Sequence, residues 1–246
     1  MRKLHVAYLT TSNRGSDSAN EDSILINQNV ISGESSGSET YEADQHGFFA
    51  ISDGLHGTSK KSHASSNLLR LLAKDIKLRP NSHAGQRITR LNDEYSTLGA
   101  VKSCYRGMAA TLVGVEYGND AIQVFHVGDS RAWHMSESVC TPLTADHTIA
   151  NLEKIDGEEL SSMYNILDGY FAVDSELPRP KNSYTTVHTE DLKTLVLASD
   201  GISVIGKELP LCSASMPLKD YIIGLKDQAI QLGSDDNISI IALRLE

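Results

Sequence analysis

Two stretches of this chain share one design, Phe48-Phe49-Ala50-Ile51-Ser52-Asp53-Gly54 and Leu195-Val196-Leu197-Ala198-Ser199-Asp200-Gly201. Each is a short apolar run that stops on Ser-Asp-Gly, which is typical of a buried strand followed by a tight turn. A buried strand delivers its last side chain to a fixed place, and glycine lets backbone or a ligand approach closely. We therefore expect the carboxylates of Asp53 and Asp200 to lie at matching strand ends, and Gly201 to serve only as a turn former.

Three further acidic turns border apolar runs: Asn20-Glu21-Asp22, Gly128-Asp129-Ser130 and Asp235-Asp236-Asn237. Hard cations such as Mg²⁺ and Mn²⁺ prefer carboxylate, carbonyl and water oxygens. A single Asp-Gly is most often an ordinary turn. Because five acidic turns recur in the same context, the pattern predicts a divalent-cation site.

The candidate metal ligands are the carboxylates of Asp53, Asp200 and Asp236 and the backbone carbonyl of Gly54. The carboxylate of Asp129 could bind a further ion. Glu21 and Asp22 are expected to hold metal-bound waters. Two cations about 4 Å apart would acidify a bridging water and clamp a phosphoryl oxygen, so that displacement needs no protein nucleophile. The sequence therefore favours phosphoryl chemistry at this site.

The composition is that of a globular chain, with 246 residues, 40% apolar and 22% charged. No composition break divides it, so we expect a single catalytic domain over residues 1–246. The net charge of -10 argues against nucleic acid or an anionic membrane surface as the main partner. The three cysteines lack a C-x-x-C spacing, which favours a cytoplasmic protein, and no run approaches the roughly 20 apolar residues of a membrane span.

Apolar runs of strand length outnumber helical segments along the chain. Strands are expected at about residues 6–9, 23–26, 48–52, 111–116, 121–127, 132–135, 184–187, 195–199 and 237–245. Helices are expected at residues 60–77, 86–98 and 218–232, and residues 33–40 are expected to form a flexible loop. Helices that interrupt runs of strands favour an α+β fold, with helices outside an antiparallel sandwich, over a doubly wound parallel sheet.

Six short motifs follow one another along the chain: Asn20-Glu21-Asp22, Asp53-Gly54, Val127-Gly128-Asp129-Ser130-Arg131-Ala132, Leu143-Thr144-x-Asp146-His147, Ala198-Ser199-Asp200-Gly201-Ile202 and Asp236-Asn237-Ile238-Ser239. In this order they resemble the motifs of the metal-dependent type 2C protein serine/threonine phosphatases, the bacterial branch in particular. The resemblance runs from about Ser12 to the carboxyl end. It implies a four-layer α-β-β-α sandwich of two antiparallel sheets flanked by helices, and hydrolysis of phosphoserine and phosphothreonine in proteins.

The resemblance also assigns roles at the site. Asp53 would bridge two Mn²⁺ or Mg²⁺ ions, the Gly54 carbonyl would bind one of them, and Asp200 and Asp236 would bind the other. Asp129, with Asp200, matches the place where bacterial members hold a third, weaker metal. A metal-bridging water would attack the phosphoryl group directly. The implied partners are phosphorylated protein substrates and a cognate serine/threonine kinase or its targets.

At several places the chain departs from the family pattern. Asp17 replaces the usual phosphate-gripping arginine, and Arg14 is either a displaced phosphate clamp or a solvated loop charge. His56, one place off the general-acid position, is either that acid or a surface side chain. His147 is expected to have a structural role. The flap expected around residues 148–177 is short, which predicts loose peptide selectivity.

Two functions remain open from the sequence. The first is an active phosphatase. The alternative is a phosphatase-like module that binds phosphoproteins and turns them over weakly, because the arginine is displaced. A nucleotide-binding transferase is disfavoured, since the chain has no Gly-x4-Gly-Lys-Ser/Thr loop.

Overall fold

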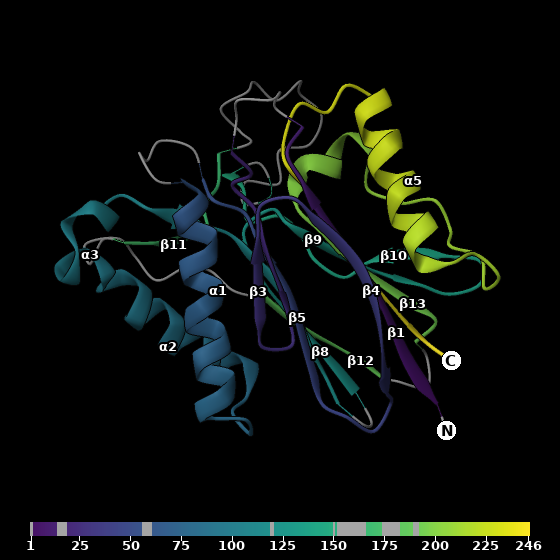
Figure 1. The fold of residues 1–246 in the computed structure, drawn as a ribbon, viewed down its shortest axis with the longest axis horizontal. Helices are drawn as coiled ribbons and strands as arrows, with labels where there is room; N and C mark the ends of the chain where they lie inside the picture. Colours follow the sequence, from purple (N-terminus) through teal and green to yellow (C-terminus); the bar gives the residue numbers. More distant parts are fainter. Residues whose placement is uncertain are drawn as a thin grey trace.

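Two antiparallel sheets lie face to face at the centre of the molecule in its computed structural model (Figure 1). The structure describes residues 2–13, 19–55, 61–118, 121–149, 151, 166–173, 183–188 and 192–246. The first sheet has the strand order β10-β9-β13-β14-β1-β4, and the second sheet has the order β12-β8-β7-β5-β2-β3. A short pair of strands, β11-β6, stands apart from them.

The strands of the first sheet are β1 (Lys3–Thr11), β4 (Ser35–Glu42), β9 (Arg131–Met135), β10 (Cys140–Pro142), β13 (Thr194–Ala198) and β14 (Ile238–Leu245). Those of the second sheet are β2 (Ser23–Ile26), β3 (Asn29–Ser32), β5 (Gly47–Ser52), β7 (Leu112–Tyr117), β8 (Ala121–Val127) and β12 (Ser183–His188). The short pair is β6 (Ala109–Ala110) and β11 (Phe171–Ala172). The α-helices are α1 (Lys61–Leu78), α2 (Ala84–Ser96), α3 (Leu98–Val101) and α5 (Leu218–Gln231), and the 3-10 helices are η1 (Ser103–Tyr105) and η3 (Asp200–Ile205).

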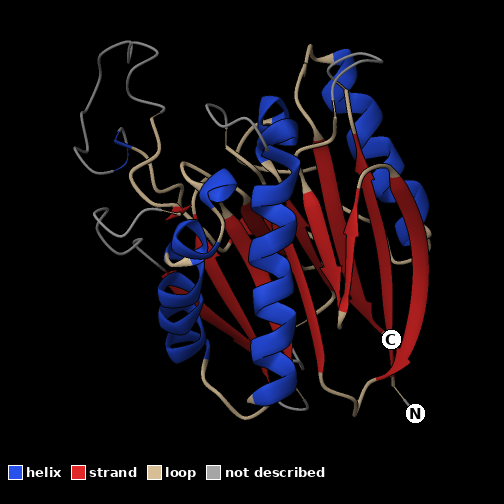
Figure 2. Ribbon diagram, turned by 60° about the vertical axis from the view of Figure 1, so that its left-hand side comes forward, coloured by secondary structure: helices blue, strands red, loops and turns tan. Residues whose placement is uncertain are grey.

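Three hydrophobic clusters separate four layers of structure. Phe49 and Ile51 of β5 point into the cluster between the two sheets, whereas Phe48 and Ala50 point to the other face, which α1 and α2 cover. Strand β13 alternates in the same way, and its outer face packs against α5. Figure 2 shows the helices on the two outer sides of the sheets. Because both faces of these central strands are buried, their sequences are almost continuously apolar.

The predicted fold class is confirmed: the chain is an α+β protein with a four-layer α-β-β-α arrangement. Every predicted strand and helix corresponds to an element of the structure, with ends displaced by a few residues at most. Within the described ranges, no helix is long and apolar enough to cross a membrane. The three cysteines are free thiols.

The expectation of a flexible loop at residues 33–40 is wrong. Residues Ser35–Glu42 form β4, which pairs with β1 from Thr10 opposite Ser35 to Lys3 opposite Glu42. Serine and glycine have low strand propensity, but β1 offers a free edge of backbone hydrogen-bonding groups. Long-range pairing therefore overrides the local composition.

A buried carboxylate joins α1 to α2. Asp75 accepts hydrogen bonds from Arg87 at 2.7 Å and from Arg90 and Arg79 at 2.8 Å. The side chains of Asp75 and Arg87 are only 3% and 1% exposed. Burial raises the pKa of Asp75, but the hydrogen bonds from Arg90 and Arg79 outweigh it and hold the pKa below its ordinary value. The carboxylate is therefore charged, and it ties the two helices together.

Candidate metal centre

Five aspartates flank strands at one edge of the sandwich: Asp22 before β2, Asp53 after β5, Asp129 between β8 and β9, Asp200 after β13 and Asp236 before β14. Antiparallel pairing brings these strand ends together, because Ser23 lies opposite Ser52 and Ala198 lies opposite Ile240. The second sheet thus supplies two aspartates, the first sheet supplies two, and Asp129 lies in the connection between the sheets. We call these five residues the aspartate cluster.

The aspartates of the cluster act on one another electrostatically. Burial raises the pKa of Asp53 well above its ordinary range, and the charges of the other four raise it further. Burial likewise raises the pKa of Asp22 to about 7, with a further rise from Asp200 and Asp236. The pKa of Asp129 also rises to about 7, through burial and then through the charge of Asp200. The cluster is thus a concentration of negative charge that a bound cation would compensate.

Some carboxylate oxygens of the cluster are buried without a hydrogen bond. Oδ1 of Asp22 and Oδ1 of Asp129 have no hydrogen-bond partner among the described residues. A buried oxygen without a hydrogen-bond partner raises the free energy of the folded state. A bound cation would supply the missing interaction. The donors are all oxygens, so the cluster fits Mn²⁺ or Mg²⁺ and not a soft metal. Among the described residues, no three or more histidine, cysteine, aspartate or glutamate side chains lie close enough together to hold a metal ion as they stand.

Ser199 aims the carboxylate of Asp22. Its hydroxyl donates to Oδ2 of Asp22 at 2.8 Å and accepts the backbone N–H of Ser239 at 3.0 Å. The serine of the second Ser-Asp-Gly turn therefore joins a loop of the second sheet to β14 of the first. Because Oδ2 is taken by Ser199, Oδ1 is the oxygen left for a ligand.

Asn237 joins the Asn20-Glu21-Asp22 turn to the Asp235-Asp236-Asn237 turn. Its Oδ1 accepts the backbone N–H of Glu21 at 2.9 Å, and its own N–H donates to Oδ1 of Asp236 at 2.7 Å. Gly201 lies so close to this turn that a Cβ built on it would overlap the carbonyl oxygen of Asn237. Gly201 is therefore more than a turn former, because it lets η3 approach the Asp236-Asn237 turn.

Thr111 is a residue of the site that sequence reasoning missed. Its hydroxyl accepts the backbone N–H of Asp53 at 3.1 Å, and its N–H donates to the carbonyl of Asp53 at 2.9 Å. The same hydroxyl lies 2.9 Å from the hydroxyl of Ser130. Thr111 thus connects the Asp53 turn to the Asp129 turn. The available signal was its place directly before the apolar run of β7.

Several other predicted site residues lie outside the residues that the structure describes or outside the aspartate cluster. Arg14, His56 and most of the expected flap, residues 152–165 and 174–177, lie outside the described residues. Gly54 is buried and forms an isolated bridge with Ala110. The side chain of Glu21 is half-buried, next to the aspartate cluster in sequence.

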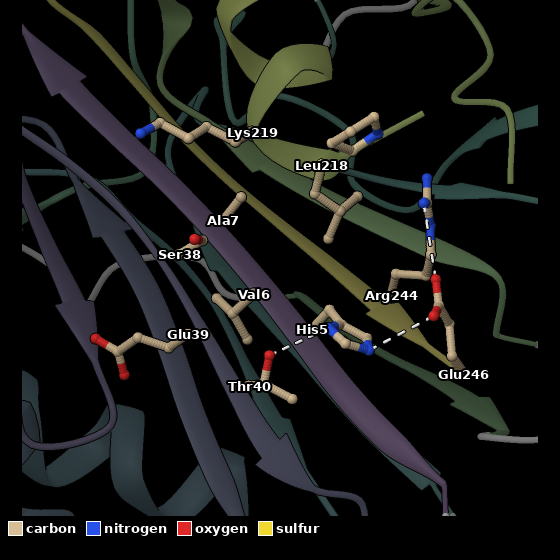
Figure 3. A pocket seen from close by; sticks show the side chains of 11 residues that line it. His5, Val6, Ala7, Ser38, Glu39, Thr40, Leu218, Lys219, Arg244 and Glu246 are labelled. Carbon is tan, nitrogen blue, oxygen red and sulfur yellow. Dashed lines mark hydrogen bonds and ion pairs between the residues drawn. The ribbon is translucent and has the colours of Figure 1, made fainter. Parts of the chain in front are cut away.

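Two cavities of about 230 Å³ are lined by residues other than the five aspartates. One is lined by Arg131, Asp146 and Lys207. Figure 3 shows the other, near the start of β1, where His5 lies 3.1 Å from Oγ1 of Thr40 and 3.5 Å from Glu246. The aspartate cluster lies at the opposite end of β1, so this second cavity is not part of it.

The chain is similar to known protein phosphatases. The family model described as Protein phosphatase 2C matches residues 6–155. A putative protein phosphatase from Mycoplasma genitalium is 29% identical over 165 residues, which are 63% of this chain and 63% of that protein. A probable protein phosphatase 2C 39 from Arabidopsis thaliana is 24% identical over 219 residues, 81% of this chain and 75% of that protein. This chain thus matches less than two thirds of the length of the Mycoplasma relative.

Solved structures have the same fold. The serine/threonine phosphatase Stp1 from Staphylococcus aureus superposes with a TM-score of 0.75 at 19% identity, covering 98% of this chain and 94% of that one. The S. agalactiae serine/threonine phosphatase gives a TM-score of 0.76 at 20% identity, with coverage of 99% and 100%. The family model covers more than half of the chain and the four-layer sandwich agrees with it. This chain therefore belongs to the protein phosphatase 2C family.

Proposed function

We propose that this chain is a metal-dependent protein phosphatase that hydrolyses phosphoserine and phosphothreonine in proteins. Support comes from family membership and from the aspartate cluster. The observation that carries the proposal is the pair of buried, bare oxygens on Asp22 and Asp129, set among carboxylates that raise one another's pKa. Such an arrangement is costly without a cation and suited to one.

In this proposal the cofactor is Mn²⁺ or Mg²⁺, and the chain supplies its ligands. Asp53 would hold both of two ions, the Gly54 carbonyl would hold one of them, and Asp200 and Asp236 would hold the other. Asp129 would hold a third, weaker ion. When bound, the ions supply an acidified water and positive charge for the phosphoryl oxygens.

The chain's own residues hold this site in shape. Ser199 fixes Asp22, and Asn237 fixes the backbone of Glu21, so that both acids are placed to order the water around the ions. Thr111 keeps the Asp53 and Asp129 turns together. Hydrogen bonds to metal-binding groups of this kind tune the affinity for the ion.

The substrates in this proposal are phosphorylated proteins, made by a cognate serine/threonine kinase. Arg14 is proposed to grip the substrate phosphate through its forked guanidinium. The net charge of -10 supports protein and not nucleic acid as partner. The free thiols support a cytoplasmic location, and we propose one catalytic domain over residues 1–246 with a short flap.

The test is hydrolysis of p-nitrophenyl phosphate and of a phosphothreonine peptide by the protein with added Mn²⁺. Turnover should disappear on chelation and in Asp200→Asn, which loses the negative charge of a proposed ligand. The matched control is Asp227→Asn, an exposed aspartate of α5 that pairs with Lys226 at 2.8 Å. The control should keep wild-type turnover.

The outcomes separate the two functions that the sequence leaves open. Mn²⁺-dependent turnover that Asp200→Asn abolishes supports the enzyme. A folded, Mn²⁺-loaded protein that binds the phosphopeptide without turnover supports the regulatory module instead. Turnover that survives both chelation and Asp200→Asn would contradict the metal assignment.

A further inference from the structure

Two histidine rings lie against each other beside the Gly128-Asp129-Ser130 turn. His126 is fully buried near the end of β8, and His147 follows β10 in the chain. Their ring centroids are 4.3 Å apart and their planes meet at 46°. Burial lowers the pKa of His126 to about 4. Neither histidine is among the proposed metal ligands, so the role of the two rings is a separate question.

His147 grips the turn through its backbone and its ring. Its backbone N–H donates to the carbonyl of Gly128 at 2.8 Å, and the N–H of Gly128 donates to Nδ1 of the ring at 3.2 Å. On the far side of the ring, Nε2 lies 2.9 Å from Oγ of Ser183 in β12. Because a backbone N–H can only donate, Nδ1 carries no proton and Nε2 carries the ring proton. His147 is therefore neutral and held in one tautomer.

The ring has little room to move. A Cβ added to Gly169 would stand 2.9 Å from Nδ1 of His147, and the N–H of Asp168 donates to the His147 carbonyl at 2.8 Å. On the other side of the turn, a Cβ on Gly128 would stand 2.7 Å from the side chain of Thr111. Gly128 has a φ of +117°, which L side chains rarely adopt. The turn is thus held between Thr111 and His147.

Asp129 depends on this turn for its direction, because its Oδ1 has no hydrogen-bond partner in the part of the chain that the structure describes. We propose that His147 is a positioning residue for Asp129: Nδ1 holds the N–H of Gly128 and thereby keeps the Asp129 carboxylate in the aspartate cluster. This inference rests on the proposed metal site and adds a residue to it. Groups that hydrogen-bond directly to a metal ligand typically change affinity 10- to 100-fold, and His147 acts through the residue next to the ligand, so we expect the lower end of this range.

Two substitutions separate the two hydrogen bonds of the ring. In His147→Asn, the amide oxygen stands near the place of Nδ1 and can still accept the N–H of Gly128. In His147→Gln, the amide nitrogen reaches toward the place of Nε2 and keeps only the bond to Ser183. Ser183→Ala is the matched control, since it removes that second bond and leaves Nδ1 intact.

The measurement is Mn²⁺ binding, followed by the loss of the electron paramagnetic resonance signal of free Mn²⁺ on titration of the metal-free protein. His147→Gln should weaken the weakest site about tenfold or more. His147→Asn and Ser183→Ala should stay close to wild type. In an Asp129→Asn background, His147→Gln should cause no further loss, because the two changes act on one site. Thermal melts in chelator keep folding defects separate from binding defects.

Several results would overturn the positioning role. These are wild-type Mn²⁺ affinity in His147→Gln, equal losses in His147→Asn and His147→Gln, or an undiminished loss in the Asp129→Asn background. A folded wild type in which no Mn²⁺ site responds to Asp129→Asn would overturn the metal assignment of Asp129 together with this inference. Normal Mn²⁺ binding without phosphatase turnover would contradict only the proposed function.

Discussion

Replacing Gly201 with alanine should destabilise the fold by about 3 kcal/mol, the upper end of the usual cost of overpacking. The new Cβ would overlap the carbonyl oxygen of Asn237 and lie 2.9 Å from its carbonyl carbon. Asn237 is held in place by its bonds to Glu21 and Asp236, so its backbone cannot easily withdraw. The obstacle is backbone and not a flexible side chain, which is why we expect the upper end.

Gly224 provides the opposite case in the same protein. It is exposed in the middle of α5, and nothing lies within 4 Å of where its Cβ would be. Alanine there should stabilise the protein by about 0.5–1 kcal/mol, because glycine is unfavourable in a helix interior. In a chain of this size each kcal/mol shifts Tm by about 2–4 °C.

Thermal melts in chelator, with urea denaturation as a second measure, compare the two variants. Gly201→Ala should lower Tm by about 6–12 °C and Gly224→Ala should raise it by about 1–4 °C. Gly201→Ala should also weaken Mn²⁺ binding, since η3 carries Asp200. A Gly201→Ala protein that melts with the wild type would refute the reasoning about close backbone approach.

Two further predictions concern charge. Without metal, stability should fall as pH rises between 3.8 and about 7, because folded Asp22 keeps a proton that the unfolded chain releases; for this group alone the shift corresponds to about 4 kcal/mol. Melts in chelator across this range measure the fall. Asp22→Asn should reduce the fall and leave the part due to Asp53 and Asp129, and saturating Mn²⁺ should counter it. Asp75→Ala should cost about 3–5 kcal/mol in urea denaturation, because buried Arg87 loses its nearest carboxylate. Lys74→Ala, which breaks only the exposed pair with Glu94, should cost less than about 1 kcal/mol.

The sequence predicts the central strands well because nearly every residue in them is buried and therefore apolar. In β5 every residue is buried, alternately toward α1 and α2 and toward the other sheet, so the whole strand is apolar up to its Ser-Asp-Gly ending. The acidic turns stand out against such runs. The strand ends and the candidate aspartates could therefore be predicted together.

The features that the sequence could not predict depend on partners far along the chain. Ser199 and Asp22 are 177 residues apart, and Asn237 and Glu21 are 216 residues apart. No local sequence pattern can therefore predict either hydrogen bond. Strand β4 fails for the same reason, because its polar sequence becomes a strand only beside β1. Close approach of two backbones, as at Gly201, also leaves no local mark except the glycine itself.

The aspartate cluster lies where the two sheets meet, and this placement links the proposed function to the stability of the fold. The hydrophobic cluster between the sheets favours their association, while the carboxylates of Asp22 and Asp53 on one side and Asp200 on the other repel each other. A cation bound here would remove that repulsion, so its binding free energy would also be folding free energy. At a metal concentration 100 times Kd the gain would be about 2.7 kcal/mol for each ion. The same buried acids that suit the site to a metal therefore make the metal-free fold less stable. For this reason Asp22→Asn should stabilise the metal-free protein and destabilise the metal-bound protein.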